Sequence, residues 1–89
     1  MSDSAGRVPV FNCVVDVQPA GPDGTIVARV VNLPGIAAIG KSEREALAAI
    51  VAQFKAEVGR LVAAGEAIPW TAEIPPAEGA ARRLIAVHL

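Results

Sequence analysis

Few side chains in this 89-residue chain could do chemistry, and the clearest candidates are one histidine, His88, and one cysteine, Cys13. Histidine-assisted nucleophilic catalysis needs a nucleophile and an orienting acid beside the imidazole, and no spacing here brings such groups to His88. Cys13 is expected to point from a strand into the core, where a thiol is usually inert. A single cysteine cannot form an internal disulfide or the usual cysteine-ligated zinc site.

The carboxylates are as dispersed as the other reactive groups. Of the nine aspartates and glutamates, only Asp16 falls within a predicted strand. Two-metal hydrolysis requires several carboxylates that converge on one point, and the glycine-rich motifs that hold phosphates are absent. We therefore expect a protein that is not an enzyme, with no catalytic residues, no metal and no cofactor.

Composition narrows the class of partner. The net charge is −1, which argues against broad neutralisation of nucleic-acid phosphates. No apolar run is long enough for a membrane span, and the first residues lack the apolar core of a signal peptide. We expect a cytoplasmic protein with no membrane contact. The hydrophobic fraction of 53 % is high for so small a chain, so part of its apolar surface should face a partner.

One long amphipathic helix is the clearest element. Ser42 is a good N-cap, and Glu45 follows at the spacing of a capping box. Apolar residues then recur every three or four positions, as one face of a helix requires, and Gly65 can end it. The pattern predicts a helix from Glu43 to Ala64. The apolar face consists of Leu47, Ile50, Val51, Phe54, Val58, Leu61 and Val62.

Strands are predicted on both sides of the helix. Alternating apolar residues indicate strands at 8–17, 25–33 and 36–40, joined by turns rich in proline and glycine. After the helix, residues 66–81 form a long loop with three prolines, and 82–89 form a fourth strand. Residues 1–7 are polar and small, and we expect them to be flexible. The chain is too short for two cores, so residues 1–89 make one domain.

The order of these elements predicts an α+β fold of βββαβ type. The first three strands should form an antiparallel meander because their connections are short. The fourth strand returns after a helical crossover, so we expect it to lie beside the first strand and parallel to it. The result is a mixed four-stranded sheet of order 3-2-1-4, with the long helix on one face.

Two surfaces are candidates for partner binding. On the sheet face away from the helix, the alternation is less polar than a solvated face should be, and we favour a buried interface there. Its residues are Val10, Val14, Val27, Arg29, Val31 and Leu84. An open sheet with this much aliphatic surface should associate with itself. We therefore expect a homodimer or larger oligomer, formed through this face or an edge strand beside it.

The second candidate surface is a smooth stripe on the back of the helix, formed by Ala48, Ala52 and Ala56. Alanine also has the highest intrinsic helix propensity, so the stripe has two interpretations. It is either a consequence of helix propensity or a face that another chain can approach closely. The sequence does not choose between the sheet face and this stripe as the site of a partner.

A family resemblance rests on residues 24–69. The chain has an aliphatic strand ending in Leu33-Pro34-Gly35, then Gly40-Lys41-Ser42, Glu45-Ala46, and a helix that ends in Gly65-Glu66-Ala67-Ile68-Pro69. In this order and spacing, the segment resembles the HicB family of antitoxin domains. The resemblance implies a partial ribonuclease-H-like βββαβ fold without the nuclease active site. The family has no short catalytic motif to transfer, so no site residue follows from it.

The resemblance also implies a function. HicB-like domains bind and neutralise a small mRNA-cleaving toxin, HicA, as the antitoxin of a type II toxin-antitoxin system. Many members add a C-terminal DNA-binding module; this sequence ends with the fourth strand, so we expect no such module and no direct DNA binding. The alternatives are a stand-alone oligomeric domain of this fold that binds another protein or a small ligand, and, last, a degenerate hydrolase.

Overall fold

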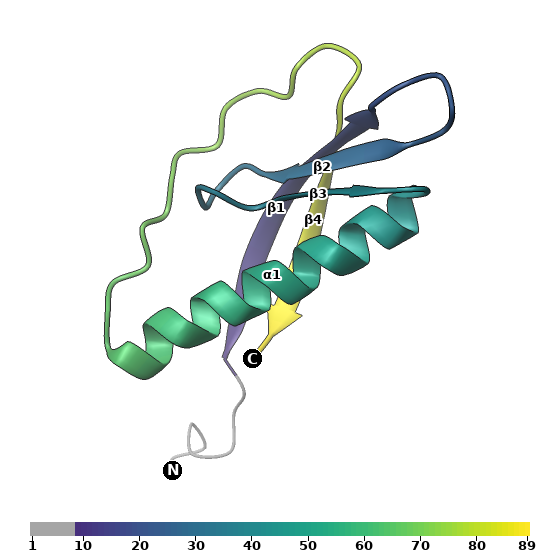
Figure 1. Ribbon diagram of the computed structural model, residues 1–89. Coiled ribbons are helices and arrows are strands. Elements are labelled where there is room, and N and C mark those ends of the chain that lie inside the picture. Colours follow the sequence, from purple (N-terminus) through teal and green to yellow (C-terminus); the bar gives the residue numbers. More distant parts are fainter. Residues whose placement is uncertain (1–8) are drawn as a thin grey trace.

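The computed structural model describes residues 9–89. The chain forms β1 (Val10–Pro19), β2 (Ile26–Val30), β3 (Ala37–Gly40), α1 (Glu43–Ala64) and β4 (Ala81–His88). The strands make one sheet of order β3-β2-β1-β4, and α1 lies diagonally across one of its faces (Figure 1). The predicted α+β class, the βββαβ order and the strand order are confirmed. The expected flexibility of residues 1–7 concerns a segment outside the described residues.

The ends of α1 follow from the local sequence. The backbone N–H of Glu45 donates to the Ser42 hydroxyl at 3.2 Å, as the predicted capping box requires. The second bond differs from the predicted capping box, because the Glu45 carboxylate accepts from the N–H of Lys41 at 2.9 Å, one residue before the N-cap. At the other end, Gly65 and Glu66 donate to the carbonyls of Val62 and Leu61. That pair of bonds is a Schellman motif, and it ends the helix where the sequence predicts.

The core lies between α1 and the facing side of the sheet. The odd-numbered residues of β1 point into it, as the alternation predicts, and so do Ala28 and Val30 of β2. From the helix, Phe54 is fully buried, together with Ile50 and Val58. Two details differ from the prediction. Val62 is 46 % exposed, and Ala46, outside the predicted apolar face, is fully buried.

The direction of β4 is where the sequence-based prediction is wrong. β4 pairs with β1 in the antiparallel sense, with Val10 opposite His88 and Val17 opposite Ala81. The other two pairings are antiparallel as well, so the sheet is not mixed. The prediction rested on the helical crossover between the third and fourth strands, which usually joins parallel strands. Instead the loop carries the chain back along the sheet, and β4 starts at the opposite end (Figure 1).

The loop between α1 and β4 is held at two points. The Trp70 ring lies beside Phe11 and Phe54, with centroids 6.1 and 6.2 Å away. Next to it, Thr71 donates its N–H to the carbonyl of Asn32 at 3.0 Å and its hydroxyl to the carbonyl of Val31 at 2.8 Å. The loop is thus fixed to the end of β2 before it crosses to the face of the sheet away from α1.

Candidate binding surface

The structure brings the six predicted sheet-face residues onto one side. In an antiparallel ladder, residues directly opposite each other point to the same face. Val14 is opposite Leu84, Val10 is opposite His88, and Val27 is opposite Gln18. Arg29 is opposite Asp16, and Val31 donates its N–H to the carbonyl of Val14 at 2.7 Å. All of these side chains lie on the face away from α1.

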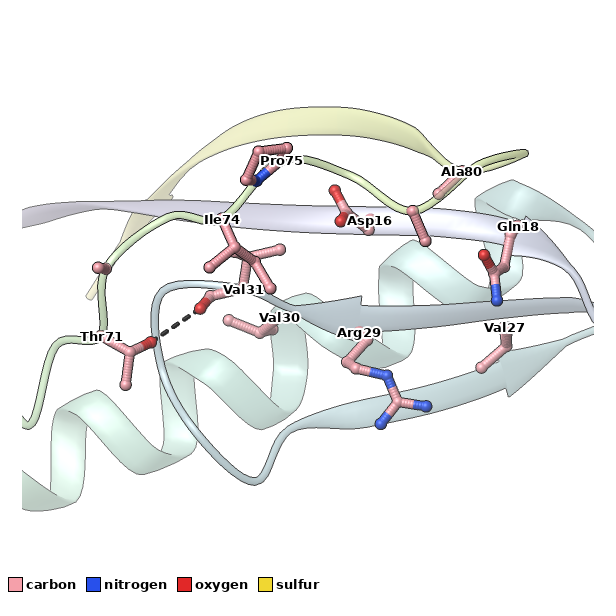
Figure 2. A pocket seen from close by; sticks show the side chains of 12 residues that line it. Asp16, Gln18, Val27, Arg29, Val30, Val31, Thr71, Ile74, Pro75 and Ala80 are labelled. Carbon is pink, nitrogen blue, oxygen red and sulfur yellow. Dashed lines mark hydrogen bonds between the residues drawn. The ribbon is translucent and has the colours of Figure 1, made fainter.

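This face is only partly open, because the loop covers some of it. Val14 is 1 % exposed although it does not face α1, whereas Leu84 is 70 % exposed. Figure 2 shows Ile74 and Pro75 of the loop on the same side as Val31 and Asp16. The sequence predicted this sheet face but not that the loop would cover part of it. No local sequence signal indicates the direction in which a proline-rich loop will run.

A groove of about 480 Å³ lies between the loop and β2. Val27, Arg29 and Val31 line its sheet side, and Thr71, Ile74 and Pro75 line its loop side (Figure 2). Most of these side chains are aliphatic, and a few polar groups stand among them. This composition is typical of sites that bind an apolar group and orient it through one or two polar contacts.

Two arginines near the groove differ in their partners. Arg82 makes two hydrogen bonds to the Asp16 carboxylate, at 2.7 and 2.9 Å. These bonds raise the pKa of Arg82 above its ordinary value. Within residues 9–89, the exposed Arg29 guanidinium bonds to no carboxylate. Arg29 is therefore the cation at the groove with donors available to a ligand or a partner.

The alanine stripe has fewer features that could bind a partner than the groove has. Ala48, Ala52 and Ala56 are all exposed on the outer side of α1, as predicted. Alanine methyl groups carry neither charge nor hydrogen-bonding capacity. The stripe stays a candidate for close approach by another chain, while the groove combines a cavity with a cation.

The isolated reactive side chains stay isolated in the fold. His88 is exposed at the end of β4, and Cys13 is fully buried. Burial raises the pKa of the Cys13 thiol to about 11. In the part of the chain that the structure describes, no three histidine, cysteine, aspartate or glutamate side chains gather to hold a metal ion. Within residues 9–89, no helix is both long and apolar enough to cross a membrane.

The residues that carry the family resemblance have structural roles. Gly35 has φ of +86°, which suits glycine. A Cβ on Gly40 would lie 2.6 Å from the backbone nitrogen of Ala46, so this strand can approach the helix only through glycine. Ser42 and Glu45 cap α1. Most of the motif thus encodes the corner and the junction between β3 and α1, whereas its aliphatic strand also supplies Val27, Arg29 and Val31 to the groove.

Sequence reasoning missed two parts of this surface, the loop side of the groove and the Asp16–Arg82 pair. The pair joins residues far apart in the chain, and it requires β4 to run antiparallel to β1 with Asp16 opposite Arg82.

Comparison of the chain with protein-family models, curated proteins and solved structures found no match.

Proposed function

We propose that this domain is an antitoxin, which binds and neutralises an mRNA-cleaving toxin of the HicA type in the cytoplasm without any catalysis of its own. The observation that carries the proposal is the groove beside β2, which aliphatic side chains line together with the exposed Arg29. Such a surface fits a protein partner that inserts an apolar side chain and presents a carboxylate or carbonyl to the arginine. The resemblance to the HicB family suggests that this partner is a HicA-type toxin.

Thr71 fixes one end of the loop that lines the groove. Its hydrogen bonds to Val31 and Asn32 hold the loop against the end of β2. A preformed groove loses less conformational entropy on binding than one that must order first. More of the free energy of the contacts in the groove therefore contributes to affinity. A protein that inhibits a toxin needs high affinity.

The test is neutralisation of a HicA-type toxin encoded beside this chain, measured as rescue of growth and as binding between the two purified proteins. Arg29→Glu reverses the charge in the groove and should weaken binding by about 100-fold or more, as loss of a buried charge contact does. Arg44→Glu is the matched control, because Arg44 is exposed on α1, which covers the opposite face of the sheet from the groove. It should neutralise like the wild type.

Two results would count against the proposal. If the wild-type protein neither binds nor neutralises the toxin, the antitoxin function is wrong. If it does but Arg29→Glu neutralises equally well, the toxin binds elsewhere, and Ala52→Glu tests the alanine stripe next.

The size of the groove favours a second candidate function, binding of a small amphipathic carboxylate. A volume of about 480 Å³ lies within the usual range for small-molecule sites. Octanoate has an apolar chain for Val27 and Val31 and a carboxylate for Arg29. If this candidate is correct, octanoate raises the melting temperature of the wild type and not that of Arg29→Glu. An equal effect on both proteins would exclude the groove as its site.

A further inference from the structure

The sheet has two edge strands, and they differ in how well they are protected. β3 at one edge has four residues. Val30 donates its N–H to the carbonyl of Ile36 at 3.0 Å, so the backbone groups of Ala37 and Ile39 point away from the sheet. The Gln53 side chain of α1 donates to the carbonyl of Ala37 at 3.2 Å. The β3 edge is therefore short and partly capped by the helix.

The β4 edge is twice as long, and its backbone groups can be assigned in the same way. Leu89 donates its N–H to the carbonyl of Pro9 at 3.0 Å. Hydrogen-bonded pairs alternate along an antiparallel ladder, so the odd-numbered residues of β4 bond to β1. The even-numbered residues then direct their N–H and C=O groups away from the sheet. These residues are Arg82, Leu84, Ala86 and His88.

Within residues 9–89, β4 lacks the usual protection of an edge strand. Edges are commonly guarded by proline, by a β-bulge or by free charged side chains. β4 contains no proline, and its pairing with β1 runs without interruption from Ala81 to His88. Its two charged residues are both neutralised within the chain. Arg82 bonds to Asp16, and Arg83 bonds to the Glu43 carboxylate at 2.8 and 3.2 Å.

We propose that two copies of this chain join through their β4 strands, antiparallel and side by side, into one continuous eight-stranded sheet. Free arginines would favour an acidic strand of another protein. Because Asp16 and Glu43 already hold Arg82 and Arg83, an edge with the same side chains meets no uncompensated charge. The strand is also self-complementary, since a two-fold axis at any of its residues places even-numbered residues opposite even-numbered residues, and these carry the outward backbone groups.

The side chains select the register. With Leu84 opposite Leu84 of the second copy, the most exposed large aliphatic residue of the sheet is covered by its own counterpart. Arg82 then lies opposite Ala86 of the other chain and Arg83 opposite Ile85, so no arginine faces another arginine. A register moved by two residues, with Ile85 at the axis, would instead bring Arg82 opposite His88.

The first test is sedimentation of the purified protein. The wild type should sediment with twice the chain mass of 9.1 kDa. Leu84→Lys places a free charge at the proposed two-fold axis and should give a monomer with an unchanged far-UV circular dichroism spectrum. Ile39→Lys is the matched control, because Ile39 on β3 is 68 % exposed and Leu84 is 70 % exposed. It should stay a dimer. A monomeric wild type, or a dimer lost in Ile39→Lys and kept in Leu84→Lys, would overturn the proposal.

The second test fixes the register without relying on a destabilising charge. Opposed residues of a hydrogen-bonded pair have Cα atoms about 5.5 Å apart, within the range of a disulfide. Leu84→Cys should therefore form an intermolecular disulfide on oxidation. Ala86→Cys should not, because two such residues lie four positions apart in the proposed register. Wild type controls for Cys13, which is buried. Faster cross-linking of Ala86→Cys than of Leu84→Cys would exclude this register.

This inference does not depend on the proposed toxin. Both tests use the pure protein, and the β4 edge shares no residue with the groove. A monomeric Leu84→Lys variant would support self-association through β4 whether or not it neutralises the toxin, because Leu84 lies on the predicted partner-binding face but outside the groove.

Discussion

At the scale of single residues, the ion pairs of Arg82 and Arg83 fix the position of β4. Arg82 and Arg83 are neighbours, but consecutive strand residues point to opposite faces. Arg82 therefore bonds to Asp16 on the adjacent strand β1, and Arg83 bonds to Glu43 at the start of α1. The two pairs fix β4 to the sheet and to the helix. Arg29, which has no such carboxylate within residues 9–89, is left to act at the groove.

Cys13 gives the first prediction, a pH dependence of stability. Its pKa in the folded protein is about 11, above the usual value of about 8.5 for a free cysteine. A raised thiol pKa means that the fold favours the neutral form. The stabilisation is complete below about pH 8.5 and is lost as the pH rises towards 11. The decline should reach roughly 3 kcal/mol at most.

The measurement is urea unfolding at a series of pH values between neutral and 11. Cys13→Ala should remove this part of the decline, while the part due to other titrating groups stays in both proteins. Identical pH profiles for the two proteins would show that the thiol ionises as easily in the folded state as in the unfolded one. A native thiol that reacts quickly with iodoacetamide at neutral pH would contradict its burial.

Two glycines give the second prediction, because they differ in the space around them. A Cβ on Gly40 would lie 2.6 Å from the nitrogen of Ala46, whereas nothing lies within 4 Å of a Cβ on Gly59. Gly40→Ala forces β3 away from α1 and should cost about 1–3 kcal/mol. Gly59→Ala lies inside the helix and should stabilise it by about 1 kcal/mol.

Thermal melting separates the two changes. For a domain of this size, 1 kcal/mol corresponds to about 4–8 °C. The melting temperature should fall for Gly40→Ala and rise for Gly59→Ala. If Gly40→Ala melts like the wild type, the strand and the helix are not in close contact at this point.

At the scale of elements, the sequence predicts those features that depend on nearby residues, such as the ends of the helix and the faces of the strands. The helix begins and ends where Ser42, Glu45 and Gly65 indicate, because capping depends on residues within one turn. The faces of β1 and β2 follow from alternation alone. The direction of β4 does not, because it depends on where the chain re-enters the sheet. Its one sequence signal is the length of the loop, since a strand that began beside the end of α1 would need only a short connection.

Phe54 gives the third prediction, which concerns the docking of α1. Its side chain is fully buried among residues of the sheet and helix, as the periodicity predicts. Phe54→Ala should cost about 3–5 kcal/mol, comparable to the whole stability of a small domain. We expect a largely unfolded protein at room temperature. Val62→Ala is the control on the same helix, because Val62 is exposed, and it should melt within a few degrees of the wild type.

At the scale of the whole molecule, one loop determines the topology. Thr71 is fixed at the end of β2, next to Val14 of β1, whereas Ala81 pairs with Val17 on the other side of β1. The chain must therefore move about three residues along the sheet and two strands across it. At ~3.3 Å per residue and ~4.8 Å per strand, this is a straight path of roughly 14 Å.

The fourth prediction follows from that path. Deleting residues 72–79 leaves only Ala80 between Thr71 and Ala81, which can span about 7 Å. The shortened chain cannot keep both the Thr71 bonds to β2 and the antiparallel pairing of β4. It should therefore lose cooperative unfolding, because the longest strand pairing in the sheet and the two arginine pairs are lost with β4.

The control replaces the same residues with glycine and serine and keeps the length. Ile74 is 66 % exposed, so this variant loses little buried area, and it should unfold cooperatively at a slightly lower temperature. Urea unfolding, followed by far-UV circular dichroism, distinguishes the two. If the deletion variant keeps a cooperative transition near that of the wild type, β4 can pair without the loop's return path. The antiparallel direction would then not depend on loop length, and a parallel β4, entered directly from the end of α1, would be compatible with this sequence.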